Sequence, residues 1–248
     1  MSTIYILWLR QLKRYFRSRA RMIGSLGQPV LFLVALGFGF GPIYAKAGQG
    51  SYIQFIAPGV IGMGIIFTAI FSGIEIIWDR QFGFLKETLV APVSRFNIML
   101  GRTLGGATVA ALQGFVVFLL TLLVGFRPTN LWLLPLAFLF MILTAIVFTA
   151  FGTALATKLQ DMQAFPIIMN FLVMPMFFLS GALFPLKGLP VAIEWIARFN
   201  PLAYGVDGMR GTLANAAHFG LMPDVLILSA IAVFFLAIGG YLFSKIEI

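Results

Sequence analysis

The densest group of ionisable residues between two long apolar runs is the stretch 78–95, WDRQFGFLKETLVAPVSR. Phe82, Leu85 and Leu89 follow one another at i, i+3 and i+7, which predicts one apolar face on a helix of about two turns, ended by Pro92. Such a helix suits a groove on a partner protein, and passive packing against the membrane surface or the bundle is an equal alternative. The candidate contact residues are Asp79, Arg80, Phe82, Phe84, Leu85, Lys86, Glu87 and Leu89.

The sequence contains few residues that could catalyse a reaction or bind a metal ion. The chain has no cysteine and one histidine, His218. One imidazole with scattered carboxylates is poor material for a metal site or a catalytic dyad, so we interpret His218 as structural or solvated. The residues contain no GxxxxGK[ST] loop for ATP phosphates. We therefore expect no enzyme activity, no cofactor and no metal in this chain.

The composition indicates that the elements around the 78–95 stretch are membrane helices. Of 248 residues, 60% are hydrophobic and only 10% are charged, which is too little polar surface for a soluble domain of this length. Several apolar runs are long enough for the ~30 Å hydrocarbon core of a bilayer. The sequence predicts an all-α polytopic membrane protein with six spans, at about 24–44, 52–77, 103–126, 131–157, 164–183 and 225–244.

The segments outside these spans have their own patterns. Residues 1–23 place apolar positions beside a basic face, which predicts an amphipathic helix at the membrane interface, although a basic tail that only sets topology is an alternative. Residues 78–102 form an inner loop. Residues 184–223 are too long for a turn and too interrupted by Pro and Gly for a span. Because irregular backbone at membrane depth needs protein or water around it, we predict a re-entrant outer segment with short amphipathic helices at about 191–199 and 203–214.

The distribution of basic residues predicts the orientation in the membrane. With six spans, both termini lie on one side, and twelve of the 17 Lys and Arg residues fall on that side. Basic residues of polytopic proteins collect on the cytoplasmic side. We therefore predict cytoplasmic N- and C-termini in the cell inner (cytoplasmic) membrane. The same rule explains the net charge of +9 without nucleic acid as a partner.

The predicted spans have apolar interiors. Ion-coupled transporters carry ionisable residues in mid-span, whereas here every charge lies at or beyond a predicted span end. Glu75, four residues before Asp79, is the deepest and lies near the inner surface. The sequence therefore indicates an energy source other than an ion gradient.

Four groups of residues resemble the membrane subunit (permease) of type-2 ATP-binding-cassette exporters, the family that includes drug-resistance, polysaccharide and nodulation-factor export permeases. They occur in the family's order from about residue 50 to residue 212. They are YIQFIAPG at 52–59, the charged stretch at 79–95, Ser180-Gly181 with FP at 184–185 and LP at 189–190, and NPL at 200–202 with Tyr204, Asp207 and Arg210.

The resemblance implies an assembly and roles for these segments. It implies one six-span permease domain at 24–248, paired with a second copy or a related permease and with two cytoplasmic ATPase subunits. The inner stretch would be the coupling helix that enters an ATPase groove, with the N-terminal helix at the interface in contact with lipid or the ATPase. The broken outer segment would close an outer gate, with Phe184, Pro185, Pro190, Asn200, Pro201, Tyr204, Asp207 and Arg210 as its candidate residues.

The resulting hypothesis is a permease that exports an amphipathic, lipid-linked or drug-like substrate with energy from a separate ATPase. Met174, Met176, Phe177 and Phe178 offer an adaptable surface for a substrate path between the second and fifth spans. Core packing or lipid contact explains these four residues equally well. Two other classes remain as alternatives: a secondary transporter, and a non-transporting membrane scaffold or assembly factor.

Overall fold

The computed structural model describes residues 2–48, 50–90, 92–159 and 161–246. These residues form helices and connecting turns, and none of them lies in a β-strand. The predicted all-α class is therefore confirmed. In chain order the helices are α1 (Thr3–Arg17), α2 (Arg19–Lys46), α3 (Tyr52–Phe71), α4 (Ile74–Gln81), α5 (Phe84–Val90), α6 (Arg95–Leu123), η1 (Leu131–Leu133), α7 (Leu134–Lys158), α8 (Ala164–Phe178), α9 (Val191–Phe199), α10 (Pro201–Ala214) and α11 (Leu221–Ser244).

Five apolar helical stretches among the described residues are long enough to cross a membrane, which confirms the polytopic membrane class. The predicted fifth span corresponds to α8, which has only 15 residues, or about 22 Å of helix. It ends where Ser180 donates its hydroxyl to the Phe177 carbonyl (2.7 Å) and Gly181 adopts a φ of +75°. A sixth crossing stays a prediction. The five stretches are Arg19–Lys46, Tyr52–Gln81, Arg95–Leu123, Leu131–Lys158 and Leu221–Ser244.

The predicted inner loop 78–102 is too wide. At one end, α4 continues to Gln81; at the other, α6 begins at Arg95, ahead of the predicted start at residue 103. Ser94 caps α6, because its hydroxyl oxygen accepts the N–H of Asn97 at 3.2 Å. Hydropathy alone does not detect these polar helical turns, which continue beyond the apolar part of each span. Only residues 82–94 separate α4 from α6, and α5 occupies most of them.

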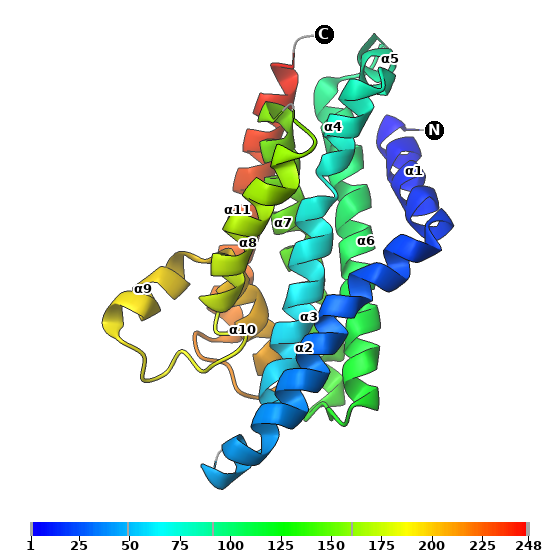
Figure 1. Cartoon of the computed structure of the whole chain (residues 1–248). Coiled ribbons are helices and arrows are strands. Elements are labelled where there is room, and N and C mark those ends of the chain that lie inside the picture. The colour runs from blue at the N-terminus through cyan, green and yellow to red at the C-terminus, as the bar shows by residue number, and fades with distance from the viewer. Residues whose placement is uncertain (1, 49, 91, 160, 247–248) are drawn as a thin grey trace.

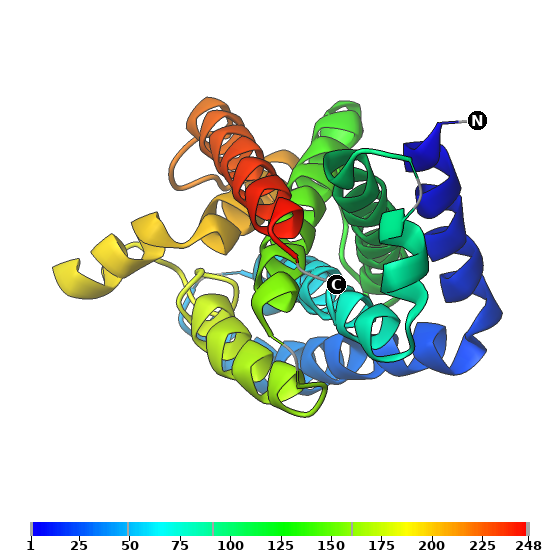
Figure 2. The same ribbon diagram turned by 90° about the horizontal axis from the view of Figure 1, so that it is seen from above.

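The centre of the bundle is formed by α3, α6 and α7, with the other helices arranged around them (Figures 1 and 2). At the junction of α3 and α4, Gly73 meets α7 with almost no space between the backbones. A Cβ atom added to Gly73 would lie 2.5 Å from the carbonyl oxygen of Gly152. Small residues at a helix contact allow this close approach, which fixes α4 against α7.

The two helices of the outer segment differ in their surroundings. Helix α9 covers the predicted residues 191–199 and projects from the bundle (Figure 1). Helix α10 packs between α3, α7 and α11, and residues 202–213 are buried on every side. The prediction that this second helix is amphipathic is therefore wrong. Gly205 and Gly208 let α10 approach Thr144 and Phe140 of α7, where an added Cβ would clash.

Candidate functional site

Asp79 lies on α4, toward the end of the bundle that carries both chain termini (Figure 1), and is 6% exposed. Its carboxylate accepts two hydrogen bonds from Arg10 of α1, both at 3.1 Å, and forms an ion pair with Arg102 of α6, Nη2 to Oδ2 at 2.7 Å. The Arg10 guanidinium also stacks over the Phe84 ring of α5 at 3.8 Å. One carboxylate thus connects α4 to two other helices, and its arginine partner reaches α5.

Glu75 lies one turn earlier on the same face of α4, as its i,i+4 spacing from Asp79 predicts, and is also buried. Its carboxylate pairs with Arg21 at 2.8 Å and with Arg14 at 3.5 Å. Both guanidinium groups lie within 6 Å of the Trp78 ring, at 5.3 Å for Arg14 and 5.9 Å for Arg21. Together, the two carboxylates of α4 meet four arginines.

Helix α1 is held against α6 by close packing and by two hydrogen bonds between side chains. A Cβ atom added to Gly105 of α6 would lie 2.7 Å from Gln11 of α1. The Trp8 indole donates to the Thr108 hydroxyl (3.0 Å), and the Tyr15 hydroxyl donates to the amide oxygen of Gln113 (2.6 Å). Burial raises the pKa of Tyr15, while Arg21 acts in the opposite direction. Tyr15 is therefore a neutral donor at this contact.

The basic face of α1 is divided between the protein and its surroundings. Arg10, Arg14 and the following Arg21 are occupied by the α4 carboxylates, whereas Lys13, Arg17 and Arg19 are exposed. Sequence reasoning treated this face as a partner for lipid or for another protein and missed its intramolecular part. The signal was the i,i+4 acidic pair on α4, which needs buried cationic partners.

Helix α5 differs from the predicted amphipathic helix. Gly83 has a φ of +80° and separates α4 from α5, so that Phe82 caps α4 and lies outside α5. Phe82 is 79% exposed, whereas Leu85 is 2% exposed and Leu89 packs partly against the core. The prediction that these three residues share one face of one helix is therefore wrong. Leu85 anchors α5 to the bundle, and Phe82 points away from it.

The corner between α4 and α5 presents a mixed apolar and charged surface. Phe82, Lys86, Glu87 and Val90 are all exposed there. Figure 1 shows α5 at one extremity of the bundle, at the same end as both chain termini. Beneath this corner lie the buried Asp79 and its arginines. We define Phe82, Lys86, Glu87 and Val90 as the α4–α5 corner.

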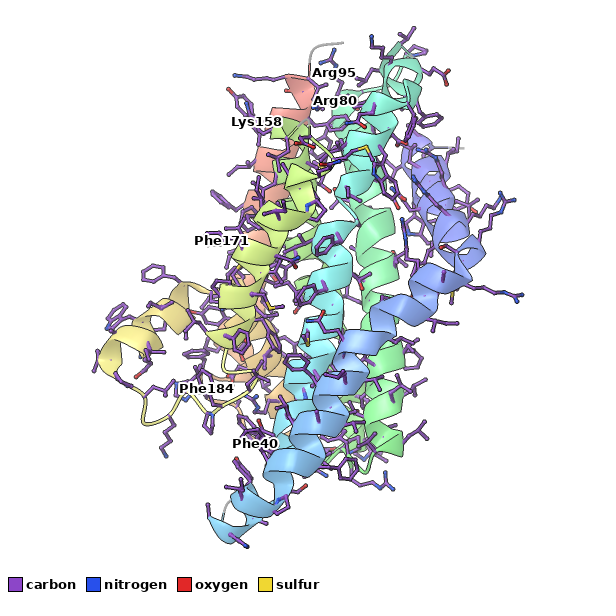
Figure 3. All side chains as sticks on the ribbon, in the orientation of Figure 1. Phe40, Arg80, Arg95, Lys158, Phe171 and Phe184 are labelled. Carbon is purple, nitrogen blue, oxygen red and sulfur yellow. The ribbon has the colours of Figure 1, made fainter. Side chains whose placement is uncertain are left out.

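Two arginines of the same region bind helix ends. Arg80 donates to the carbonyl oxygens of Thr157 (2.9 Å) and Leu159 (3.3 Å) at the end of α7. Arg95 donates to the carbonyl oxygen of Ser244 (2.7 Å) at the end of α11. Guanidinium groups suit these positions because the last carbonyls of a helix lack intrahelical donors. Figure 3 shows both side chains at the end of the bundle that carries α5.

At the opposite end, buried charges hold together the segment that the sequence predicts to be outer. The carboxylate of Asp207 accepts backbone N–H groups from His218 (2.7 and 2.9 Å) and Phe219 (2.8 Å). The Arg210 guanidinium donates to the carbonyl oxygen of Gly181 at 2.8 Å. The His218 side chain itself is exposed. These contacts join α10 to the α10–α11 loop and to the segment after α8.

The remaining outer candidates are arranged around the start of α10. Asn200 caps this helix, because its Oδ1 accepts the N–H of Leu202 at 3.0 Å, and Pro201 occupies the first turn. The Tyr204 hydroxyl donates to the carbonyl of Arg198 (2.6 Å). The other three candidates lie in the segment before α9: Phe184 is partly buried, and Pro185 and Pro190 are exposed.

The four candidates for a substrate path do not share one surface. Phe177 is fully buried and makes an edge contact with Phe32 of α2, with ring centroids 6.1 Å apart. Phe178 is 43% exposed, and Met174 and Met176 are partly buried. For Phe177, core packing is therefore the better interpretation.

The chain folds into a helical membrane bundle, and short contacts hold the α4–α5 corner at one end of it. Sequence comparison places the chain in a known class of protein. Residues 2–214 match the model of the ABC-2 type transporter family, and the chain belongs to this family of transport permeases. It is 31% identical to Nodulation protein J of Rhizobium leguminosarum bv. viciae over 212 residues, which are 82% of this chain and 81% of that protein. It is 32% identical to transport permease ycf38 of Pyropia yezoensis over 218 residues, 85% of this chain and 73% of that protein. The resemblance inferred from the four sequence groups is confirmed.

Proposed function

We propose that this chain is the transmembrane subunit of an ATP-driven exporter, which moves an amphipathic, lipid-linked or drug-like substrate out of the cytoplasm. Membership of the ABC-2 type transporter family supports the permease role. The 248 residues carry no P-loop. ATP hydrolysis is accordingly assigned to a separate ATPase chain, two copies of which serve a pair of permeases.

The observation that carries this proposal is the α4–α5 corner. It exposes an aromatic ring and both signs of charge, which suits a groove on a partner protein. The helix beneath it is tied to its neighbours by the Asp79–Arg102 pair, by Arg80 at the end of α7 and by the contact of Gly73 with Gly152. A push on this corner therefore reaches α6 and α7 through short contacts rather than through a mobile loop.

The proposed topology follows the sequence. Both termini are cytoplasmic, and α8 with the residues after it makes a short fifth crossing in the inner membrane. Helix α1 lies at the cytoplasmic interface. The segment 184–223 is re-entrant from the outer side and serves as an outer gate, in which Asp207 holds the α10–α11 loop and Arg210 holds the residues after α8.

Ion-coupled transport is the alternative function to compare, because the structure buries several charged residues that the sequence analysis placed at or beyond the ends of the spans. Glu75, Asp79, Arg102 and Asp207 are all buried, yet each has an ion pair or a hydrogen-bond partner. Such partners indicate structural pairs rather than sites that exchange an ion. Asp224, in the first turn of α11, is the exception, because its buried carboxylate has no cationic partner among the described residues and lies beside the carboxylate of Asp207.

Reconstitution tests the proposed function. The permease is incorporated into proteoliposomes with and without the co-expressed ATPase, and uptake of a panel of fluorescent amphiphiles is measured with ATP present. Uptake that requires both the ATPase and ATP is expected. Uptake that persists without the ATPase and follows an imposed proton gradient would show a secondary transporter instead.

A further inference from the structure

A cavity of ≈ 390 Å³ lies beside the elbow between α1 and α2 and is enclosed on its other sides by α3, α4 and α6. Its wall combines polar and apolar side chains from all five helices. The polar part includes Tyr15, Arg21, Gln28, Glu75 and Trp78, and the apolar part includes Pro29, Phe67, Phe71 and Val109.

Two polar atoms in this wall lack hydrogen-bond partners. Trp78 lines the cavity, and its indole Nε1 is buried without an acceptor among the described residues. The Oε2 atom of Glu75, a residue that is 4% exposed, accepts no hydrogen bond there and has only the 3.5 Å ion pair with Arg14. Buried polar groups in native proteins have partners in the great majority of cases. Both atoms have almost no exposed area, so the groups that a ligand in the cavity can reach are the ring of Trp78 and the partly exposed Arg21.

The charge around the cavity favours an anionic acceptor. Arg21 lines the cavity, and Arg14, which lies outside its wall, also approaches Glu75 and the Trp78 ring. Two cations therefore meet one carboxylate beside the polar end of the cavity. Arg21 has a side chain that is 38% exposed and keeps further N–H groups available. Guanidinium groups bind phosphate oxygens through charge-assisted hydrogen bonds.

The position of the cavity indicates which kind of molecule would carry the anionic group. Its polar end lies at the junction between the amphipathic α1, which ends at the exposed Arg17, and the apolar α2, which begins at the exposed Arg19. Exposed apolar side chains continue along α2 from this point, among them Ile23 at 71% and Leu31 at 62%. On a membrane protein, basic surface gives way to apolar surface at the depth at which the lipid headgroups adjoin the hydrocarbon core.

We propose that this cavity is a binding site for an anionic phospholipid. The phosphate accepts hydrogen bonds from the further N–H groups of Arg21, and the start of one acyl chain packs against the rings of Trp78, Phe67 and Phe71. The rest of the lipid extends along the exposed face of α2. This bound lipid is a structural ligand that joins the α1–α2 elbow to α4, and it does not depend on the proposed export function.

Tryptophan fluorescence tests the site directly, because the chain contains only four tryptophans. Trp8, Trp132 and Trp195 are replaced by Phe, which leaves Trp78 as the sole emitter. The protein is reconstituted in phosphatidylcholine bilayers that contain increasing fractions of phosphatidylglycerol with brominated acyl chains. With brominated phosphatidylglycerol, we expect the quenching of Trp78 to saturate at a low mole fraction of that lipid. In a second series with brominated phosphatidylcholine, we expect the quenching to rise only in proportion to its mole fraction.

Two variants in this background test the residues. Arg21→Gln removes the cation and is expected to raise the half-saturating mole fraction about tenfold, as for the loss of a charged hydrogen bond. Ser25→Leu keeps every charge and places bulk in the wall, and it is expected to abolish saturation. Arg17→Gln removes an exposed charge outside the cavity wall and is the matched control.

The results distinguish a specific lipid site from nonspecific contact with the bilayer. Saturable quenching by phosphatidylglycerol that both cavity variants weaken, and that Arg17→Gln leaves unchanged, supports the site. Quenching that is proportional to mole fraction for both lipids, or saturation that survives both cavity variants, overturns it.

Discussion

Arg102 and Asp79 form an ion pair in which Nη2 and Oδ2 are 2.7 Å apart and both side chains are almost completely buried. Among the described residues, the Nε and Nη1 atoms of Arg102 have no hydrogen-bond partner. The cation therefore depends on one carboxylate, and that carboxylate sits directly beneath the α4–α5 corner. The pair connects the corner to the centre of the bundle through α6.

Removal of this carboxylate should be costly. Asp79→Asn leaves the Arg102 guanidinium buried without a counter-ion, and we expect a loss of about 3–5 kcal/mol in the free energy of unfolding. Thermal unfolding in detergent measures the effect. The double variant Asp79→Leu with Arg102→Met removes both charges and is expected to be more stable than Asp79→Asn. If the single variant unfolds at the wild-type temperature, the pair does not stabilise the bundle.

A charge reversal at the corner should uncouple the permease without unfolding it. Glu87 is exposed, so Glu87→Arg is expected to leave insertion and thermal stability unchanged, and to reduce ATP-dependent transport at least about tenfold. Transport in proteoliposomes with the ATPase is the measurement. Lys46→Glu reverses an exposed charge at the far end of α2 and serves as the control. Equal transport by both variants would contradict the role of the corner.

Phe82 and Leu85 should behave differently from each other, since only one of them is accessible. Phe82→Ala is expected to weaken binding of the ATPase while the free energy of unfolding stays unchanged, because the ring is 79% exposed. Leu85→Ala empties a buried position and is expected to cost about 2–5 kcal/mol of stability. Pull-down of the ATPase and thermal unfolding separate the two effects. A stability loss in Phe82→Ala equal to that in Leu85→Ala would contradict this assignment.

The contact between α1 and α6 should depend on Gly105. Gly105→Val places a side chain against Gln11, and overpacking of this kind costs about 1–3 kcal/mol. We expect α1 to separate from α6 and trypsin to cleave faster after Arg10 and Lys13. Gly39→Val is the matched control, because a Cβ there meets nothing within 4 Å. Unchanged cleavage in Gly105→Val would show that α1 is held by other contacts.

The outer loop should loosen when its buried acceptor is removed. Asp207→Ala leaves the N–H groups of His218 and Phe219 without their acceptor, and hydrogen exchange of residues 216–220 is expected to accelerate by at least about tenfold. Asp207→Asn keeps one acceptor oxygen and is expected to have a smaller effect. Glu194→Gln changes a partly exposed carboxylate of α9 and is the control. Equal exchange in the wild type and Asp207→Ala would contradict the role of Asp207 in holding the α10–α11 loop.

The sequence predicts some features of this protein well, and the reasons are physical. Apolar runs of span length define α2, α3, α6, α7 and α11, and the pattern of residues 184–223 predicts α10 from about residue 203, two residues after its observed start at Pro201. The acidic pair on α4 signals a need for cationic partners, but Arg10 lies 69 positions from Asp79 in the sequence, and no local pattern identifies it as the partner. Periodicity also misplaced Phe82, because a single glycine with a positive φ breaks the helix that the spacing implied.

The central claim is that the α4–α5 corner meets a separate ATPase, and photo-crosslinking tests it most directly. Benzoyl-phenylalanine replaces Phe82 in one variant and Trp132 in another. Trp132 lies in η1, which follows α6, and is 92% exposed. Both variants are irradiated in native membranes that contain the co-expressed ATPase, and crosslinked chains are identified by mass spectrometry. We expect a P-loop ATPase to crosslink from position 82 and not from position 132. Crosslinks from position 82 to lipid or to the permease alone, with the ATPase present, would contradict the account.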